Sequence, residues 1–284
     1  MKNFTFKLSY NPPLDWQTLL KFFLMHQIIG VERISDNTYE RGFRINGIIG
    51  FFKITNQIPC LILEVKLTDK SLLPLIKQQV ENMFDLNLDV KLLAEKFSQH
   101  SLLKNTYVNY PALRIPGGWD KFETSINTIV SQSISIAAAR KILAKLVVMY
   151  GMQIIHPDAK QIMYLFPEPQ TLYKADLMSL GMNNMKITAI KELSAKVISK
   201  EIDLETDNHE QLKLDLLKVK GIGHWTTEYI MLRCAQSKNA FPGNDLILKR
   251  YTKEHLDLQE FEGIKSYLAI YLWQHYLSSK CKII

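Results

Sequence analysis

The chain has 284 residues, of which 47% are hydrophobic, and it carries a formal net charge of +7 with a pI near 9.1. This composition can bury a core in one large domain or two modest ones, which excludes intrinsic disorder as the class. The moderately basic balance permits a nucleic-acid partner but does not require one.

The spacing of the cysteines and the length of the apolar stretches indicate in which cellular compartment the protein is expected. Cys60, Cys234 and Cys281 are far apart, so the sequence contains neither a disulfide framework nor a CxxC metal spacing. A reduced cytoplasm is the expected location. The N-terminus alternates apolar and polar residues, unlike a signal peptide. Since no apolar stretch approaches the about 18 residues of a membrane span, no membrane partner is expected.

The first part of the chain has the pattern of a sheet with helices. Period-two alternation marks strands in "KNFTFKL" and "CLILEVKL", and Asn46-Gly47 stands between apolar runs as a hairpin signal. Amphipathic helices are predicted in "DWQTLLKFFLMHQI" and "DKSLLPLIKQQVENMF". Residues 1–110 are therefore predicted to form an antiparallel α+β domain.

The character of the sequence changes near Tyr110. The segment "NYPALRIPGGWD" is rich in proline and glycine, which is typical of a boundary. Beyond it, segments such as "KFETSINTIVSQ" and "SISIAAARKILAKLVVMYG" have helical periodicity. Residues 111–284 are predicted to form an all-helical bundle of about eight helices.

A tight turn joins two helical patterns in "LDLLKVKGIGHWTTEYIMLRCA". Gly221 and Gly223 permit unusual dihedral angles and a close approach of a ligand to the backbone. The next helix would direct its free N–H groups at the turn, which together with Lys218 and Lys220 suits a DNA phosphate. The alternative is a glycine cap between two packed helices.

An aspartate follows this hairpin by about one helix length, in "NAFPGNDLILKR". Asp245 opens a further helical pattern, so a helix N-cap is the simple interpretation. Its distance along the chain from the hairpin also allows it to reach a sugar carbon of a DNA strand held there.

Taken together, "LLKVKGIGHWTTEYIMLR" and "AFPGNDLILKR" resemble the helix-hairpin-helix DNA glycosylase superfamily. "NPPLDW", "ALRIPGGWDKFETSINTIVSQSIS", "LGMNNMKITAI" and "SYLAIYLWQ" resemble its alkylation-repair branch, the 3-methyladenine DNA glycosylase II (AlkA-like) proteins. The resemblance covers nearly the whole chain. It implies an N-terminal antiparallel, TBP-like α+β half followed by an all-α helix-hairpin-helix core.

The resemblance also implies the reaction, which is hydrolysis of the N-glycosidic bond of alkylated purines flipped out of duplex DNA. Asp245 would stabilise the oxocarbenium-like sugar or orient a water toward it. Bifunctional relatives carry a lysine nucleophile where this chain has Trp225, so a monofunctional enzyme without a lyase step is expected.

The same resemblance assigns the pocket and the DNA contacts. Trp225, Tyr229, Trp273 and Phe22 would form the base pocket, with core packing as the alternative for each. Gln132 aligns with a residue near the gap left by the flipped base. Ser133 departs from the bulky apolar wedge of many relatives, so Ile134 or Gln132 takes that role or flipping is weaker. The implied DNA contacts are Gly221, Ile222, Gly223, His224, Lys218, Lys220, Gln132 and Ser133.

The resemblance further implies a candidate Na⁺ or K⁺ site at the carbonyls of Leu217, Val219 and Ile222, and no other cofactor. An iron–sulfur cluster needs four closely spaced cysteines, which the lone Cys281 cannot supply. The alternative for His224 is a solvent-exposed position at the start of a helix, without a contact to DNA. The other histidines are expected to be structural. A cytoplasmic, nucleoid-associated monomer acting on damaged double-stranded DNA is expected.

The sequence is also compatible with three competing functions. The first is an oxidised-purine (8-oxoguanine type) glycosylase with lyase activity, against which Trp225 argues. The second is a non-catalytic DNA-binding protein, which would need neither Asp245 nor the aromatic pocket. The third is a helical interaction protein, for which the hairpin and the aspartate would be coincidental.

Overall fold

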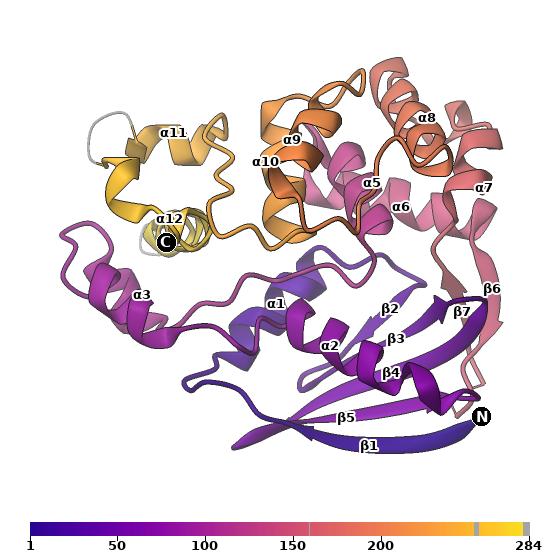
Figure 1. Cartoon of the computed structure of the whole chain (residues 1–284), viewed down its shortest axis with the longest axis horizontal. Helices are drawn as coiled ribbons and strands as arrows, with labels where there is room; N and C mark the ends of the chain where they lie inside the picture. Colours follow the sequence, from indigo (N-terminus) through magenta and orange to yellow (C-terminus); the bar gives the residue numbers. More distant parts are fainter. Residues whose placement is uncertain (159, 253–255, 281–284) are drawn as a thin grey trace.

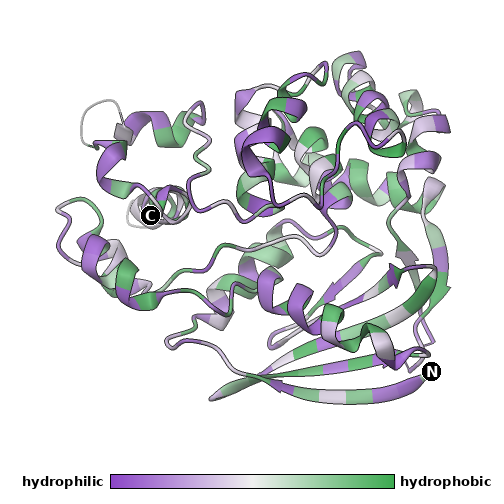
Figure 2. Ribbon diagram, in the orientation of Figure 1, coloured by the Kyte–Doolittle hydropathy of each residue, from purple (hydrophilic) through white to green (hydrophobic). Residues whose placement is uncertain are grey.

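The computed structural model describes residues 1–158, 160–252 and 256–280. Figure 1 shows a twisted antiparallel sheet at one side of the molecule and a group of helices at the other. Apolar and polar residues alternate along the strands in Figure 2, which is the pattern of a sheet with one face packed on a core. Cys281 and the segment 253–255 lie outside the described residues.

The N-terminal sheet has five strands in the order β1-β5-β4-β3-β2. A two-residue turn joins β3 to β4 at Asn46-Gly47, where both residues have positive φ, so the predicted hairpin is confirmed. Helices α1 and α2 bury their apolar faces against the sheet. The elements are β1 (Lys2–Leu8), α1 (Trp16–Met25), β2 (Glu32–Ile34), β3 (Thr38–Ile45), β4 (Ile48–Gln57), β5 (Cys60–Leu67), η1 (Lys70–Leu72) and α2 (Leu73–Met83).

A second core is built from helices. Side-chain N-caps start several of them where the sequence places Asp, Ser or Asn, as Asp120 does for α5 and Ser135 for α6. The elements are α3 (Val90–Phe97), α4 (Lys104–Asn109), α5 (Lys121–Ser131), α6 (Ile136–Tyr150), α7 (Pro169–Lys174), η2 (Met178–Leu180), α8 (Asn184–Ile198), α9 (His209–Leu217), α10 (His224–Arg233), α11 (Leu246–Thr252), η3 (Leu258–Phe261) and α12 (Lys265–Lys280).

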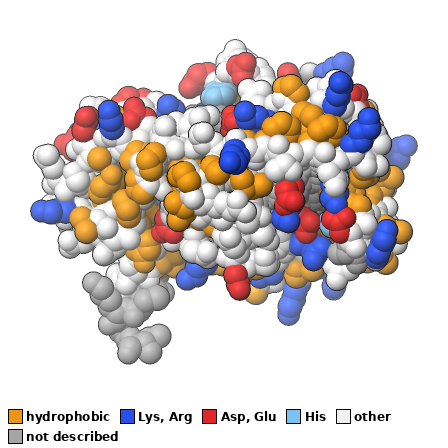
Figure 3. All heavy atoms as spheres, turned by 90° about the horizontal axis from the view of Figure 1, so that it is seen from below, with side chains coloured by type: hydrophobic (Ala, Val, Ile, Leu, Met, Phe, Trp, Pro, Cys, Tyr) orange, Lys and Arg blue, Asp and Glu red, His pale blue; other side chains and the backbone are white. Residues whose placement is uncertain are grey.

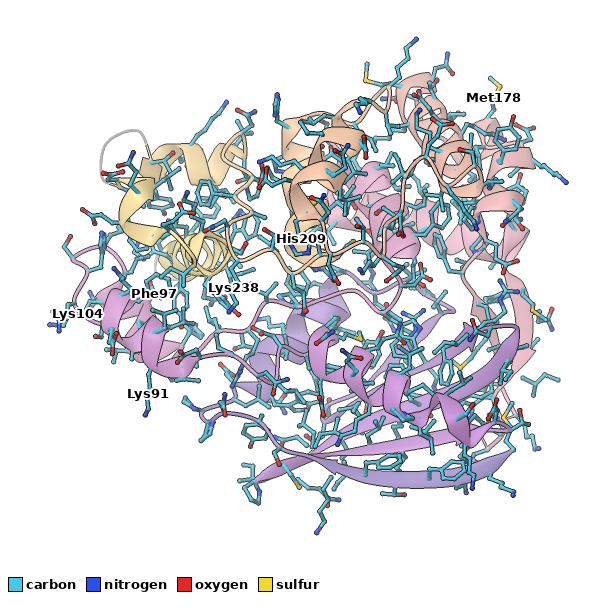
Figure 4. The ribbon with its side chains drawn as sticks, in the orientation of Figure 1. Lys91, Phe97, Lys104, Met178, His209 and Lys238 are labelled. Carbon is cyan, nitrogen blue, oxygen red and sulfur yellow. The ribbon has the colours of Figure 1, made fainter. Side chains whose placement is uncertain are left out.

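Helices α3 and α4 precede residue 110 in the chain but pack with the helical core. Phe97 of α3 is fully buried, and its ring centroid lies 4.6 Å from that of Tyr271 in α12. Figure 4 shows Phe97 where α3 lies next to α12. The sheet core, in contrast, draws on residues up to Leu86 and on Trp119.

The prediction of an entirely helical second part is wrong in one respect. Strands β6 (Met152–Ile155) and β7 (Ile162–Leu165) form an antiparallel hairpin between α6 and α7. Ile154, Met163 and Leu165 pack on Phe51 of the N-terminal sheet. Because the hairpin is stabilised by that contact with a distant segment, short local periodicity did not reveal it.

A buried ion pair joins the two halves. Arg41 of β3 donates to both carboxylate oxygens of Glu123 in α5, at 3.0 and 2.7 Å. Both residues are at most 5% exposed. Burial alone would lower the pKa of Arg41, but Glu123, Tyr39 and Glu32 together outweigh burial and hold that pKa well above its usual value. The pair therefore fixes the sheet against the helical core.

Surface features are less specific. On the face seen in Figure 3, acidic and basic side chains are interspersed among hydrophobic ones, without a continuous basic stripe. Within the part of the chain that the structure describes, helices with the length and apolarity of a membrane span are absent.

Candidate active site

The two glycines of the hairpin between α9 and α10 differ in what they require. Gly221 has φ +92°, and a Cβ atom there would lie 2.9 Å from the Met185 carbonyl oxygen. The conformation and packing of the turn therefore require glycine at position 221. Gly223 has extended backbone, and a Cβ atom there would meet nothing within 4 Å. Packing therefore does not require glycine at position 223. Close approach of a ligand to the backbone would require it.

Helix α10 begins at this turn with its first amides uncapped. Gly223 occupies the N-cap position, and no side chain accepts a hydrogen bond from the first turn. Uncapped amides at the positive end of a helix attract an anion. His224 and Lys220 are exposed beside them. Lys218 is also exposed, but its Nζ forms an ion pair with Oδ1 of Asp215 at 2.7 Å.

The turn between α5 and α6 is attached to the hairpin. Gln132 donates through Nε2 to the Gly221 carbonyl at 3.0 Å and to the Thr226 hydroxyl at 2.7 Å. Ser133 follows with φ +54° and is exposed, and Ile134 is exposed next to it. The predicted DNA-contact residues on these two segments are thus neighbours in space.

Asp245 both caps a helix and faces aromatic side chains. Its Oδ1 accepts from the amides of Ile247 and Leu248 at 2.8 and 3.2 Å, which starts α11. The same Oδ1 accepts from the indole Nε1 of Trp273 at 3.2 Å, and Oδ2 accepts from that of Trp225 at 3.3 Å. The N-cap interpretation is therefore confirmed, and the same carboxylate also contacts two of the predicted pocket residues.

Three of the four predicted pocket aromatics form one cluster. The rings of Trp225 and Tyr229 are stacked, with centroids 5.2 Å apart and an interplanar angle of 16°. Tyr229 lies 5.9 Å from Trp273 at 58°. All three side chains are partly buried, and Trp273 also packs against the helical core. Together with Asp245, which precedes α11, they form one group of contacting side chains from α10, α12 and the start of α11.

Phe22 of α1 joins this cluster through a residue that the sequence analysis missed. The Arg233 guanidinium carbon lies 4.8 Å from the Phe22 ring centroid and 5.8 Å from that of Tyr229. Arg233 also donates to the Pro116 carbonyl through Nε. The only sequence signal was its spacing of four from Tyr229 on one helix face.

His26 covers Phe22 as well, with ring centroids 4.1 Å apart and nearly parallel planes. Burial, followed by the charge of Arg233, lowers the pKa of His26 to about 4, so the imidazole is neutral at physiological pH. Because His26 and Arg233 both take up ring face on Phe22, this phenylalanine offers less stacking surface than its predicted role implies.

Two protein families match consecutive parts of this sequence. Residues 5–120 match the AlkA N-terminal domain. Residues 126–266 match the HhH-GPD superfamily of base excision DNA repair proteins. The second match contains the hairpin and Asp245.

Individual relatives agree with these matches. The chain is 26% identical to DNA-3-methyladenine glycosylase 2 of Escherichia coli over 94% of its own length and 96% of the relative's. It is 30% identical to the alkylbase DNA glycosidase-like protein mag2 of Schizosaccharomyces pombe, over 54% and 76% of the two chains. The solved 3-methyladenine DNA glycosylase of Archaeoglobus fulgidus superposes with a TM-score of 0.78 at 20% identity, covering 95% and 97% of the chains.

Proposed function

Because the chain belongs to the HhH-GPD superfamily of base excision DNA repair proteins and carries an AlkA N-terminal domain, we propose that it is a monofunctional glycosylase that hydrolyses the N-glycosidic bond of alkylated purines in DNA. The observation that carries this proposal is the contact of Asp245 with two indole N–H groups beside an uncapped helix end. The relatives named for 3-methyladenine support that base as a substrate, and we extend the proposal to purines of the 7-methylguanine type.

The hairpin supplies the anchoring contact with DNA. A phosphate beside Gly223 would accept hydrogen bonds from the first amides of α10 without reading the base sequence. Since Gln132 connects this hairpin to the α5–α6 turn, a strand held at the hairpin is also placed against Ser133 and Ile134. The damaged base leaves the stack there and enters the aromatic site.

Asp245 then acts on the sugar. A purine alkylated at N3 or N7 is cationic and leaves readily, so positive charge develops on the sugar in the transition state. A carboxylate fixed by four N–H donors stabilises that charge without having to reorganise. Water completes the hydrolysis, because Trp225 occupies the position of the lysine that would form a Schiff base.

Stacking on the aromatic cluster favours a cationic base. A cation over tryptophan gains about 0.5–2 kcal/mol. Both Trp225 and Trp273 direct their indole N–H toward the aspartate. A non-catalytic DNA-binding protein would have no use for this arrangement, and an oxidised-purine lyase would need the lysine that is missing.

We assign the filling of the vacated stack to Ile134. Gln132 is committed to the hairpin by two hydrogen bonds, and Ser133 is too small to replace a base. Ile134 is 37% exposed on the same turn, and an apolar side chain inserted into DNA is a recurrent wedge.

We also propose that the hairpin carbonyls of Leu217, Val219 and Ile222 hold Na⁺ or K⁺ next to the phosphate. The Val219 oxygen accepts the Ile222 amide at 3.0 Å, but a carbonyl keeps a second lone pair, so these residues fit a weakly bound ion. Within residues 1–158, 160–252 and 256–280, groups of three or more His, Cys, Asp or Glu suited to a metal ion are absent. The protein is proposed to act as a cytoplasmic, nucleoid-associated monomer.

The test is release of bases from methylated duplex DNA by the native chain and by Asp245→Asn. The native chain should release 3-methyladenine, and strand breaks should appear only after hot alkali. Asp245→Asn should lower the rate constant by about 10²–10³ while still binding DNA. Breaks formed without alkali would instead support a lyase, and no release by the native chain would favour a DNA-binding protein.

A further inference from the structure

The two oxygens of Asp245 are held unequally. Oδ1 receives three donors, namely the amides of Ile247 and Leu248 and the indole of Trp273. Oδ2 receives one, the indole of Trp225, at 3.3 Å. Three donors exceed the two lone pairs of a carboxylate oxygen, so Oδ1 has no capacity left, whereas Oδ2 keeps a lone pair.

We propose that Oδ2 is the oxygen that faces the sugar, and that Trp225 and Trp273 are positioning residues that orient this carboxylate through their N–H groups in addition to stacking. This inference rests on the glycosylase function proposed above. It assigns two separable tasks to each indole: the ring face binds the base, and the ring edge holds the aspartate.

The geometry of Trp225 connects the two tasks. Tyr229 is stacked on one face of the indole, so a base can stack only on the opposite face. Asp245 lies at the Nε1 edge of the same ring. A stacked base lies about 3.5–4 Å above the indole. Its sugar, which projects from the base edge, can then meet Oδ2 just beyond the edge of the tryptophan.

The two tryptophans should differ in importance for the carboxylate. Without the N–H of Trp273, Oδ1 is still held by two backbone amides. Without the N–H of Trp225, Oδ2 loses the only donor found for it among the described residues, and the carboxylate is free to turn. The edge of Trp225 is therefore expected to matter more than that of Trp273.

Site-specific replacement of tryptophan by benzothienylalanine separates the tasks, because sulfur replaces the N–H while the fused ring remains. Single-turnover release of 7-methylguanine from a defined duplex would be measured across pH for analogues at positions 225 and 273. The matched control is the analogue at Trp16, whose Nε1 donates to the Asn37 carbonyl at 3.2 Å in the N-terminal half. Binding to a duplex with a tetrahydrofuran abasic analogue would be measured in parallel.

The analogue at 225 should lose roughly tenfold in rate, which is the size expected for one hydrogen bond to a charged group. The acid limb of its pH profile should move to higher pH, because the ionised carboxylate has lost a donor. Position 273 should show the same changes to a smaller extent, and position 16 none. Binding to the abasic analogue should be unchanged throughout.

Native rates and pH profiles in both site analogues would overturn the positioning role and leave the indoles with stacking alone. A faster reaction of the analogue at 225 would overturn it too, because the N–H would then compete with the sugar for Oδ2. The native chain is measured in the same assay. Failure of the native chain to release any base would instead refute the glycosylase function itself.

Discussion

Two carboxylates of this molecule are held in opposite ways. Glu123, between the sheet and the helical core, is nearly inaccessible to solvent and is paired with the guanidinium of Arg41. Asp245 is partly exposed, and its hydrogen-bond donors are the neutral N–H groups of two indoles and two amides. A structural carboxylate has its charge cancelled, whereas the proposed catalytic one is oriented with its charge left to act on a cation.

The sharpest test replaces each of the two carboxylates by the corresponding amide and compares the loss of stability. Glu123→Gln should reduce the free energy of unfolding by about 3 kcal/mol, because it leaves Arg41 buried without its main partner. Urea denaturation measures this. Asp245→Asn should change stability by less than about 1 kcal/mol, since asparagine caps helices as well as aspartate does.

The control for Glu123 is an exposed pair on the sheet. Lys53 and Glu64 lie 2.6 Å apart with both side chains well exposed. Glu64→Gln should cost less than about 1 kcal/mol. If Glu123→Gln proved equally mild, the two halves would be joined by packing alone and the contrast between the two carboxylates would lose its meaning.

The hairpin offers a second contrast, between fold and DNA contact. Gly221→Ala should destabilise the protein by about 2 kcal/mol, because alanine is strained at positive φ and its Cβ meets the Met185 carbonyl. Gly223→Ala should cost only about 0.5 kcal/mol as a poorer N-cap. It should nevertheless weaken DNA binding roughly tenfold, since a methyl group would separate the backbone from the phosphate.

Thermal denaturation and fluorescence anisotropy with a labelled duplex measure the two effects. Undiminished affinity in Gly223→Ala would mean that the backbone of the hairpin does not approach the phosphate. A stable Gly221→Ala protein would show that the turn can rearrange, which its packing against α8 does not suggest.

The smallest expected effect on the free energy of unfolding concerns a third carboxylate, that of Asp85. Asp85 accepts from the amide of Ile115 at Oδ2 and from the hydroxyl of Tyr267 at both carboxylate oxygens. Burial raises its pKa to about 6, against the opposing effects of the Ile115 amide and Arg114. A raised pKa stabilises the protonated folded form, so this contribution is complete below pH 3.8 and is lost as pH rises through about 6.

The difference in unfolding free energy between the native chain and Asp85→Asn should therefore vary with pH between about 4 and 6. The native chain should lose stability relative to the variant as pH rises through this window. A difference independent of pH would show that the Asp85 carboxyl titrates alike in the folded and unfolded states.

The sequence predicted more of the fold than of the site. The Asn46-Gly47 turn and the helical periodicity are local signals, so they were readable. The β6–β7 hairpin was not, because its apolar residues gain their meaning from Phe51 in a distant strand.

At the site, glycine and aspartate were locally recognisable, but their partners were not. That Trp225 and Trp273 meet the same carboxylate follows from the packing of three helices, and no spacing in the sequence encodes it. The same holds for Gln132, whose two bonds to the hairpin span about ninety positions of the chain. Arg233 was overlooked because it resembles any other basic residue on a helix.

The double use of Asp245 has an evolutionary consequence. Its role as helix cap can be taken over by asparagine without loss of the fold, while the proposed chemistry cannot. A single nucleotide change in an aspartate codon gives asparagine. We therefore expect that the single substitution Asp245→Asn would turn the proposed enzyme into a folded protein that binds alkylated DNA without releasing the base.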